Sequence, residues 1–456
     1  MSNPLPFALT LVGIALLPAA QAAENSKPNI VLFIADDCTF NDLGCYGGVN
    51  VKTPHIDRLA REGMRFSNMH QAVAMSSPTR HNLYTGIYPA RSGAYPNHTF
   101  AKEGTRSIAH YLNAAGYKTA LVGKSHIQPK SVFPFDMMAP LKKGVLDYEA
   151  IERFMGDGRT NRQPFFLVVA SNQPHRPWTM GNPSKIEQEQ IALPPYCVES
   201  PETRAEYARY LAEVGYMDGE FGRVMALLDK GALSENTMVV FLSEQGATFP
   251  LSKWTCYDMG VRSAAIVRYP GVVEPGSSCE ALVEYVDVVP TLVEAVGVKP
   301  SKALDGKSFL AQLKGSKAAH KDYTFSMQTT RGIIHGSDFY GIRGISDGEY
   351  RYIINLTPEV EFANIEMREP LFKHWEQLAA EGNKEAQSLI SQYKRRPARE
   401  LYNVKRDPYC RTNLAEDPQH AARIGRMDKE LKAWMVRCGD RGQQTELEAF
   451  EHMGNR

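Results

Sequence analysis

Short runs of β-branched and aromatic residues recur along the first 270 residues, and polar positions follow most of them. The runs are continuous rather than alternating, which is typical of strands buried on both faces of a sheet. They are Asn29–Ile34, Thr119–Val122, Phe165–Val169, Thr237–Leu242 and Ala264–Arg268. Helical stretches lie between them, namely Thr53–Glu62, Ser107–Ala115 and Pro201–Lys230. This alternation predicts an α/β fold, a large and mostly parallel sheet sandwiched by helices.

The pattern changes after about residue 320. Phe339–Ile345 and Glu349–Asn355 flank Ser-Asp-Gly, which predicts an antiparallel β-hairpin. Helical segments are expected over Leu371–Lys394 and Ala421–Cys438. We therefore expect a large domain over residues 24–320 and a smaller C-terminal α+β domain over residues 321–456.

The N-terminus resembles a secretory leader. The apolar run Phe7–Leu17 is too short to span a membrane, and Ala20–Ala22 offers an A-x-A cleavage site. No Lys or Arg precedes the run, in contrast to most leaders. We expect a signal peptide over residues 1–23, a secreted or periplasmic protein and no transmembrane segment.

The charges nearly cancel, since 52 Lys and Arg face 51 Asp and Glu for a formal charge of +1. No global field therefore draws nucleic acid to this chain, and recognition of an anion must be local.

Chemically active residues follow four of the predicted strands. In open α/β sheets ligands bind beyond the carboxyl ends of the strands, so these positions are expected to meet in one cleft. They are Asp36-Asp37, Lys124-Ser125-His126, His175-Arg176 and Glu244-Gln245.

Adjacent carboxylates repel unless a cation lies between them, and a hard divalent ion bound by oxygens is a common solution. Asp36, Asp37, Glu244 and Gln245 could form such a cage. Taken singly, an Asp-Asp pair is more often a turn or a helix cap, and a single Lys or His is more often a surface cation. The shared position of the residues favours a site.

The segment Ala74–Gly86 resembles the sulfatase signature, in which Cys or Ser, any residue, Pro, a small residue and Arg precede a Gly six residues later. Further similarity covers Pro28–Asp37, Thr53–Leu59, Tyr285–Thr291 and Glu400–Val404. The chain is identified as a member of the type I sulfatase family, within the alkaline-phosphatase-like superfamily.

The resemblance implies a mechanism. A maturase would oxidise Ser76 to formylglycine, whose hydrate is the nucleophile and can expel sulfate by collapsing to the aldehyde. Calcium would be bound by that residue together with Asp36, Asp37, Glu244 and Gln245, although most relatives have Asp-Asn or Asp-His at the last two positions. Arg80 and Lys124 would neutralise charge and His126 would assist collapse of the diol. His175 and Lys253 would border the leaving oxygen, and either could donate the proton.

The substrate is less defined. Similarity is closest to the heparan N-sulfatase branch, but Glu244-Gln245 and Lys253 differ from that branch. The differences favour removal of O-sulfate from a different glycan, with N-sulfoglucosamine as the alternative. A signal peptide and a glycan substrate would place the enzyme in a periplasm, where oligosaccharides arrive already trimmed, which favours an exo-acting enzyme. Six residues could line a sugar subsite or serve ordinary packing: Arg176, Trp178, Trp254, Tyr257, His335 and Arg343.

Two other functions remain open. A formylglycine-dependent phosphoester or phosphonate-ester hydrolase has the same motif. A protein that binds sulfated glycans without catalysis would keep Ser76 unmodified.

Overall fold

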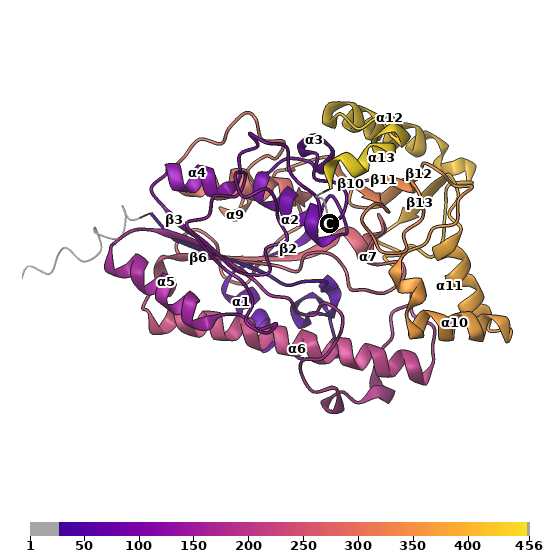
Figure 1. The fold of residues 1–456 in the computed structure, drawn as a ribbon, viewed down its shortest axis with the longest axis horizontal. Coiled ribbons are helices and arrows are strands. Elements are labelled where there is room, and N and C mark those ends of the chain that lie inside the picture. Colours follow the sequence, from indigo (N-terminus) through magenta and orange to yellow (C-terminus); the bar gives the residue numbers. More distant parts are fainter. Residues whose placement is uncertain (1–26, 454–456) are drawn as a thin grey trace, which may run out of the picture.

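The computed structural model describes residues 27–453, so the predicted signal peptide lies outside the described residues. The chain forms a large sheet with helices on both faces and a second, smaller sheet beside it (Figure 1). This confirms the predicted α/β class with an antiparallel sheet in the C-terminal part. None of the helices in residues 27–453 has the length and apolar character needed to cross a membrane.

The large sheet has the strand order β4-β3-β5-β1-β6-β7-β2-β8, and β9 pairs with β2. Neighbouring strands run parallel from β4 to β6, whereas β7 is antiparallel to both β6 and β2. The strands are β1 Asn29–Ile34, β2 Met64–His70, β3 Lys118–Gly123, β4 Met137–Ala139, β5 Phe165–Ala170, β6 Thr237–Leu242, β7 Arg262–Arg268, β8 Ser277–Cys279 and β9 Val283–Glu284.

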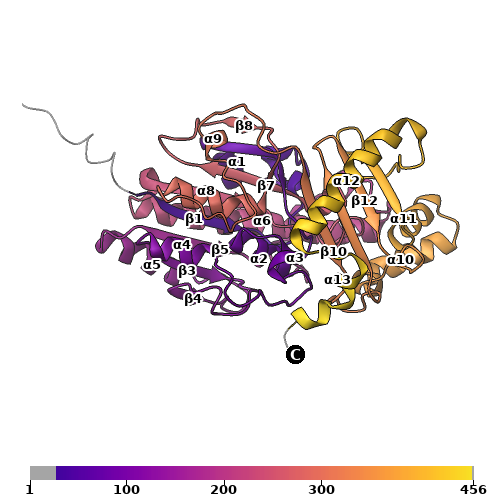
Figure 2. The same ribbon diagram turned by 90° about the horizontal axis from the view of Figure 1, so that it is seen from above.

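Both faces of the central strands are buried, which explains their continuous apolar sequences. Successive side chains of a strand point to opposite faces. In β1, Val31 and Phe33 pack in one core with residues of α1 (Pro54–Glu62), α5 (Tyr148–Thr160) and α6 (Pro201–Lys230). Ile30 and Leu32 pack in another core with residues of α2 (Ser76–Thr85), α4 (Ile108–Ala114), α8 (Val288–Ala295) and α9 (Leu310–Leu313). Figure 2 shows the same layers from above. A strand with one solvent-facing side would have required polar alternation.

The helices mostly keep their predicted limits, and Pro201–Lys230 and Ala421–Cys438 match to the residue. They are α1 Pro54–Glu62, α2 Ser76–Thr85, α3 Pro89–Ser92, α4 Ile108–Ala114, α5 Tyr148–Thr160, α6 Pro201–Lys230, α7 Asp258–Val261, α8 Val288–Ala295, α9 Leu310–Leu313, α10 Pro370–Ala380, α11 Lys384–Lys394, α12 Ala421–Cys438 and α13 Gln443–Leu447.

The second sheet is antiparallel, with the order β10-β11-β12-β13. Its strands are β10 Thr324–Thr329, β11 Gly341–Ser346, β12 Tyr350–Asn355 and β13 Arg399–Asn403. The predicted hairpin is confirmed as β11 and β12, with Ser346 paired to Arg351 next to the turn. Helices α10 to α13 lie around this sheet (Figures 1 and 2).

Two residues expected to line a sugar subsite instead hold this part of the fold together. Arg343 on β11 is fully buried, and its Nη2 donates to Asp440 at 3.0 Å and to Glu446 at 2.9 Å. Tyr257 is also buried and donates its hydroxyl to Glu400 at 2.8 Å. Neither side chain has surface left for a ligand, so both predictions were wrong.

Replacing Arg343 with alanine should lower the free energy of unfolding by about 3–5 kcal/mol, because Asp440 and Glu446 would remain as buried carboxylates without their cation. Urea unfolding measures the change. Arg209→Ala is the matched control, since Arg209 is exposed and its pair with Glu206 is worth about 1 kcal/mol or less. A loss under about 1 kcal/mol in Arg343→Ala would contradict the structural role.

Candidate active site

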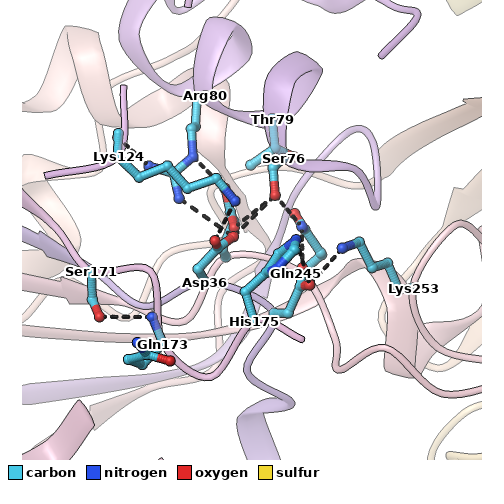
Figure 3. A network of polar contacts seen from close by, with 12 residues as sticks. Asp36, Ser76, Thr79, Arg80, Lys124, Ser171, Gln173, His175, Gln245 and Lys253 are labelled. Carbon is cyan, nitrogen blue, oxygen red and sulfur yellow. Dashed lines mark hydrogen bonds and ion pairs between the residues drawn. The ribbon is translucent and has the colours of Figure 1, made fainter. Parts of the chain in front are cut away.

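Four parallel strands end side by side, and the predicted site residues follow them directly. The register pairs Ile34 of β1 with both Ala170 of β5 and Leu242 of β6, and it pairs Gly123 of β3 with Ala170. The residues after these ends therefore meet at one edge of the sheet, as the sequence predicted. Figure 3 shows Asp36, Lys124, His175 and Gln245 converging there on Ser76.

Several of these residues adopt the left-handed backbone conformation, which is unfavourable for residues other than glycine. The φ angles are 60° at Asp37, 52° at His126 and 53° at Glu244. Each such residue costs about 1–3 kcal/mol and persists where its surroundings determine it, which is common at functional sites. At the end of β3, Gly123 has φ 106°, and a Cβ there would lie 2.0 Å from the carbonyl oxygen of Ala170. This close approach brings the Lys124 backbone against β5.

The signature segment forms α2, which begins at Ser76 and is buried along its whole length. The helix ends at Gly86, whose φ of 65° suits glycine and whose N–H donates to Asn82 at 3.0 Å. Ser76 thus lies in the first turn, where unpaired N–H groups and the helix dipole favour negative charge. The spacing from Ser76 to Gly86 is the length of one buried helix.

Three carboxylates meet beside Ser76. One oxygen from each of Asp36, Asp37 and Glu244 lies within 4.8 Å of the others, and all three residues are buried. The Ser76 hydroxyl lies 3.0 Å from Asp36 Oδ1 and 3.3 Å from Glu244 Oε2. Gln245 is the fourth neighbour, and its Nε2 donates to Asp37 Oδ1 at 2.7 Å and to Ser76 Oγ at 2.9 Å.

Three cations compensate this cluster. Arg80 Nε lies 2.8 Å from Glu244 Oε1, and its Nη2 lies 3.5 Å from Asp36 Oδ1. Lys124 contacts Asp36, and Lys253 contacts Asp37.

The pairing sets the protonation of the carboxyl groups. Burial alone would raise the pKa of Asp36, but Lys124 and other neighbouring cations hold that pKa well below its usual value. The pKa of Asp37 is lowered in the same way, because Lys253 and the other neighbouring cations together outweigh the effect of burial. The pKa of Glu244 is raised instead, since burial and the charge of Asp36 outweigh Arg80.

The oxygen atoms of the acidic cluster are suitable ligands for a hard divalent cation. All are carboxylate or amide oxygens, the ligands that Ca²⁺ prefers. Gln245 Oε1 is buried and has no hydrogen-bond partner among residues 27–453, although buried polar atoms are normally paired. A bound cation would give this oxygen a partner and would offset the repulsion among the three carboxylates.

The two predicted histidines flank the cluster differently. His175 Nε2 lies 3.6 Å from Asp37 Oδ2. Its side chain is one-third exposed and therefore lies between the acidic cluster and solvent. His126 follows Lys124 after β3, and its carbonyl accepts from the Ser77 hydroxyl at 3.1 Å.

The remaining candidates for a sugar subsite differ in exposure. The prediction that Trp178 stacks on a sugar ring is wrong. Phe249 stacks on the Trp178 ring, with the ring centroids 5.2 Å apart, and the Arg176 guanidinium lies 4.4 Å from the Trp178 ring centroid. Trp254 is mostly buried beside Lys253. His335 is exposed.

Arg176 is held by two glutamates. Its Nη1 lies 3.0 Å from Glu369 and 3.4 Å from Glu366. Because Arg176 directly follows His175, this pairing ties the His175 loop to the C-terminal part of the chain.

Three supporting hydrogen bonds were not predicted. Thr248 donates its hydroxyl to Asp37 Oδ2 at 2.9 Å. Ser171 accepts from the Gln173 N–H at 2.9 Å (Figure 3). It also donates to Glu220 at 2.5 Å, and the two contacts anchor the turn after β5. The only sequence feature that could have identified Thr248 is its position three residues after Gln245. No sequence feature pointed to Glu220 on α6.

Comparisons with known proteins agree with this geometry. The Sulfatase family profile matches residues 28–298, and a profile described as N-sulphoglucosamine sulphohydrolase, C-terminal, matches residues 250–362. An ulvan-active sulfatase of Formosa agariphila is 30% identical over 92% of this chain and 82% of its own. The human N-sulphoglucosamine sulphohydrolase is 26% identical over 96% of this chain and 95% of its own.

A solved structure shares the fold. It is of a protein in complex with its substrate D-glucosamine-2-N,6-O-disulfate, and it superposes with a TM-score of 0.70 at 18% identity, covering 92% of this chain and 100% of that one. The profile match spans more than half of the 456 residues. With the site geometry, it establishes that the chain belongs to the sulfatase family and is a sulfuric ester hydrolase.

Proposed function

We propose that this enzyme removes O-linked sulfate from a sulfated carbohydrate, using formylglycine formed from Ser76 and a bound Ca²⁺. The observation that carries the proposal is the position of Ser76. Its hydroxyl lies at the start of a buried helix and contacts Asp36 and Glu244, the carboxylates that Lys124 and Arg80 pair with.

Formylglycine at position 76 would supply a hydrated aldehyde, with one oxygen to attack sulfur and a second that lets sulfate leave by collapse of the diol. The surroundings of Ser76 suit such a group. The first turn of α2 and the nearby cations favour a negatively charged oxygen there. A formylglycine-generating maturase is therefore a required partner.

Asp36, Asp37, Glu244 and Gln245 would hold Ca²⁺, which supplies a Lewis acid next to residue 76. Glu and Gln are each one methylene longer than Asp and Asn. Ca²⁺ accepts flexible ligand geometry, so the longer side chains are compatible with binding.

The cations of the centre bind and orient the sulfate group. Arg80 and Lys124 neutralise the negative charge of the nucleophile at residue 76 and of the sulfate oxygens next to it. Lys253 and His175 lie on the Asp37 side, where a proton donor is needed as the S–O bond breaks. Burial would lower the pKa of Lys253, but Asp37 raises it above its usual value, so Lys253 remains a cation.

A recessed nucleophile supports exo-acting cleavage. Ser76 is only 4% exposed, so a sulfate group must enter between the surrounding side chains. An exported protein would meet such oligosaccharides in the periplasm or outside the cell.

The relatives support two substrates. The 30% identical relative is an ulvan-active sulfatase, which favours an O-sulfated polysaccharide or its fragments. The C-terminal profile match and the human relative favour N-sulfoglucosamine as the second candidate.

Sulfate release from a panel of substrates tests the reaction. The matured wild type should release sulfate from O-sulfated oligosaccharides faster than from N-sulfated glucosamine. Ser76→Ala should reduce turnover to background and should unfold at the same urea concentration as the wild type. Ser92→Ala, a buried serine on α3 away from the centre, is the control and should keep wild-type turnover.

Faster turnover of the N-sulfated sugar would favour the second candidate. Turnover only of phosphoesters or phosphonate esters would replace the proposed reaction with that of a formylglycine-dependent relative. Tight binding of the sulfated sugars with no turnover of any substrate would mark a binding protein instead.

Calcium binding has a readout that needs no substrate. Adding CaCl₂ to chelator-treated protein should raise the melting temperature, since a ligand at 100 times its Kd stabilises the folded state by about 2.7 kcal/mol. Asp37→Asn should lose most of this increase, and Asp157→Asn, which changes an exposed aspartate on α5, should keep it. Equal stabilisation of wild type and Asp37→Asn would contradict the site.

A further inference from the structure

A second histidine lies against the histidine that follows β3. Nε2 of His126 and Nδ1 of His98 are 3.1 Å apart, and the ring centroids are 4.9 Å apart. His126 is half-buried, whereas His98 is exposed. The signature segment and the strand ends do not include His98, and no role was expected of it.

The backbone holds His98 in a disfavoured conformation. Its φ is 53°, in the left-handed region. Both neighbours are anchored to distant segments, since the Asn97 N–H donates to the Arg331 carbonyl at 3.1 Å and the Thr99 hydroxyl donates to the His452 carbonyl at 2.9 Å. A strained residue persists where several contacts determine it. Two distant segments therefore fix the backbone on either side of His98.

The two ring nitrogens of His126 have different surroundings. Nε2 contacts His98, whereas Nδ1 is buried and has no hydrogen-bond partner among residues 27–453. Burial, followed by the charges of Lys124, Arg80 and His98, lowers the pKa of His126 well below its usual value despite the opposing charge of Asp36. The ring is therefore neutral and carries one proton, on either Nδ1 or Nε2.

We propose that His98 is a positioning residue that keeps this proton on Nε2 of His126. His98 Nδ1 accepts the Nε2–H hydrogen bond, which leaves Nδ1 of His126 with a free lone pair. The inference rests on the proposed function, in which the diol at residue 76 collapses to release sulfate, and it assigns to Nδ1 of His126 the removal of a proton from an oxygen of that diol. In that step one O–H bond breaks, one N–H bond forms at Nδ1, and the imidazolium keeps its Nε2–H bond to His98.

Without the acceptor on His98, the proton of His126 can occupy either nitrogen. The form protonated at Nδ1 cannot take a second proton there. Losing the partner that orients a metal-bound histidine typically costs about 10–100-fold in metal affinity or activity, and we expect a loss of the same order for His126. We expect His98→Ala to lower kcat by about that factor and to leave KM nearly unchanged.

His98→Asn separates orientation from simple packing. The amide oxygen of asparagine can replace Nδ1 as the acceptor, so this variant should recover most of the lost kcat. His420→Ala, which removes a partly exposed histidine beside Tyr350, is the matched control and should keep wild-type kcat. Equal loss of kcat in His98→Ala and His98→Asn would overturn the proposal.

Nitrogen NMR on protein labelled with ¹⁵N-histidine reads the tautomer directly, with the His126 signals assigned from a His126→Gln spectrum. The wild type should show a protonated Nε2 and an unprotonated Nδ1, and His98→Ala should show a mixture of both tautomers. A wild-type ring protonated at Nδ1, or an unchanged tautomer in His98→Ala, would refute the assignment. This measurement needs no turnover, so an inactive wild type would count against the proposed function alone.

Discussion

The burial of three carboxylates beside one serine is the constraint on which the rest of the structure depends. One oxygen from each of Asp36, Asp37 and Glu244 lies within 4.8 Å of the others, and all three residues are fully buried. Like charges so close in a low dielectric repel strongly, and burying them unpaired would cost several kcal/mol each. Arg80 and the two lysines that contact Asp36 and Asp37 offset much of this cost. The same cations that stabilise the cluster provide the charge that a sulfate group requires.

The sheet meets this constraint because its central strands end in register. Parallel strands buried on both faces form a rigid edge, so residues just beyond it are placed by the backbone rather than by mobile loops. Left-handed residues at Asp37, His126 and Glu244 turn the chain sharply there. The Ser171–Glu220 contact and the Arg176 ion pairs then support the segment that carries His175. Conformational strain at the site is compensated by packing elsewhere.

Much of the fold could be predicted because its signals are local. Continuous apolar runs mark the central strands, and the limits of α6 and α12 follow from Pro, Gly and the helical period. Strands β2 and β10 were missed, since Met64–His70 has polar and half-buried positions and Thr324–Thr329 is largely polar although buried. Their pairing with distant strands, rather than their own sequence, makes them strands.

The site was predictable for the same reason, and the subsite was not. Residues after buried strands and the signature segment identify the centre from short-range patterns. Arg343, Tyr257 and Trp178 have side chains typical of sugar binding, but their partners lie elsewhere in the chain. The partners of Arg343, for example, lie 97 and 103 residues away. Only the folded structure shows that these side chains are already occupied, and only it brings His98 to His126.

The chemical state of residue 76 tests the account most directly. Mass spectrometry of the tryptic peptide that contains Ser76, on protein from its native host or co-expressed with a maturase, would detect formylglycine. The account predicts a peptide that has lost two hydrogens and whose aldehyde reacts with a hydrazine reagent. An unmodified serine in active protein from the native host would contradict the proposed nucleophile.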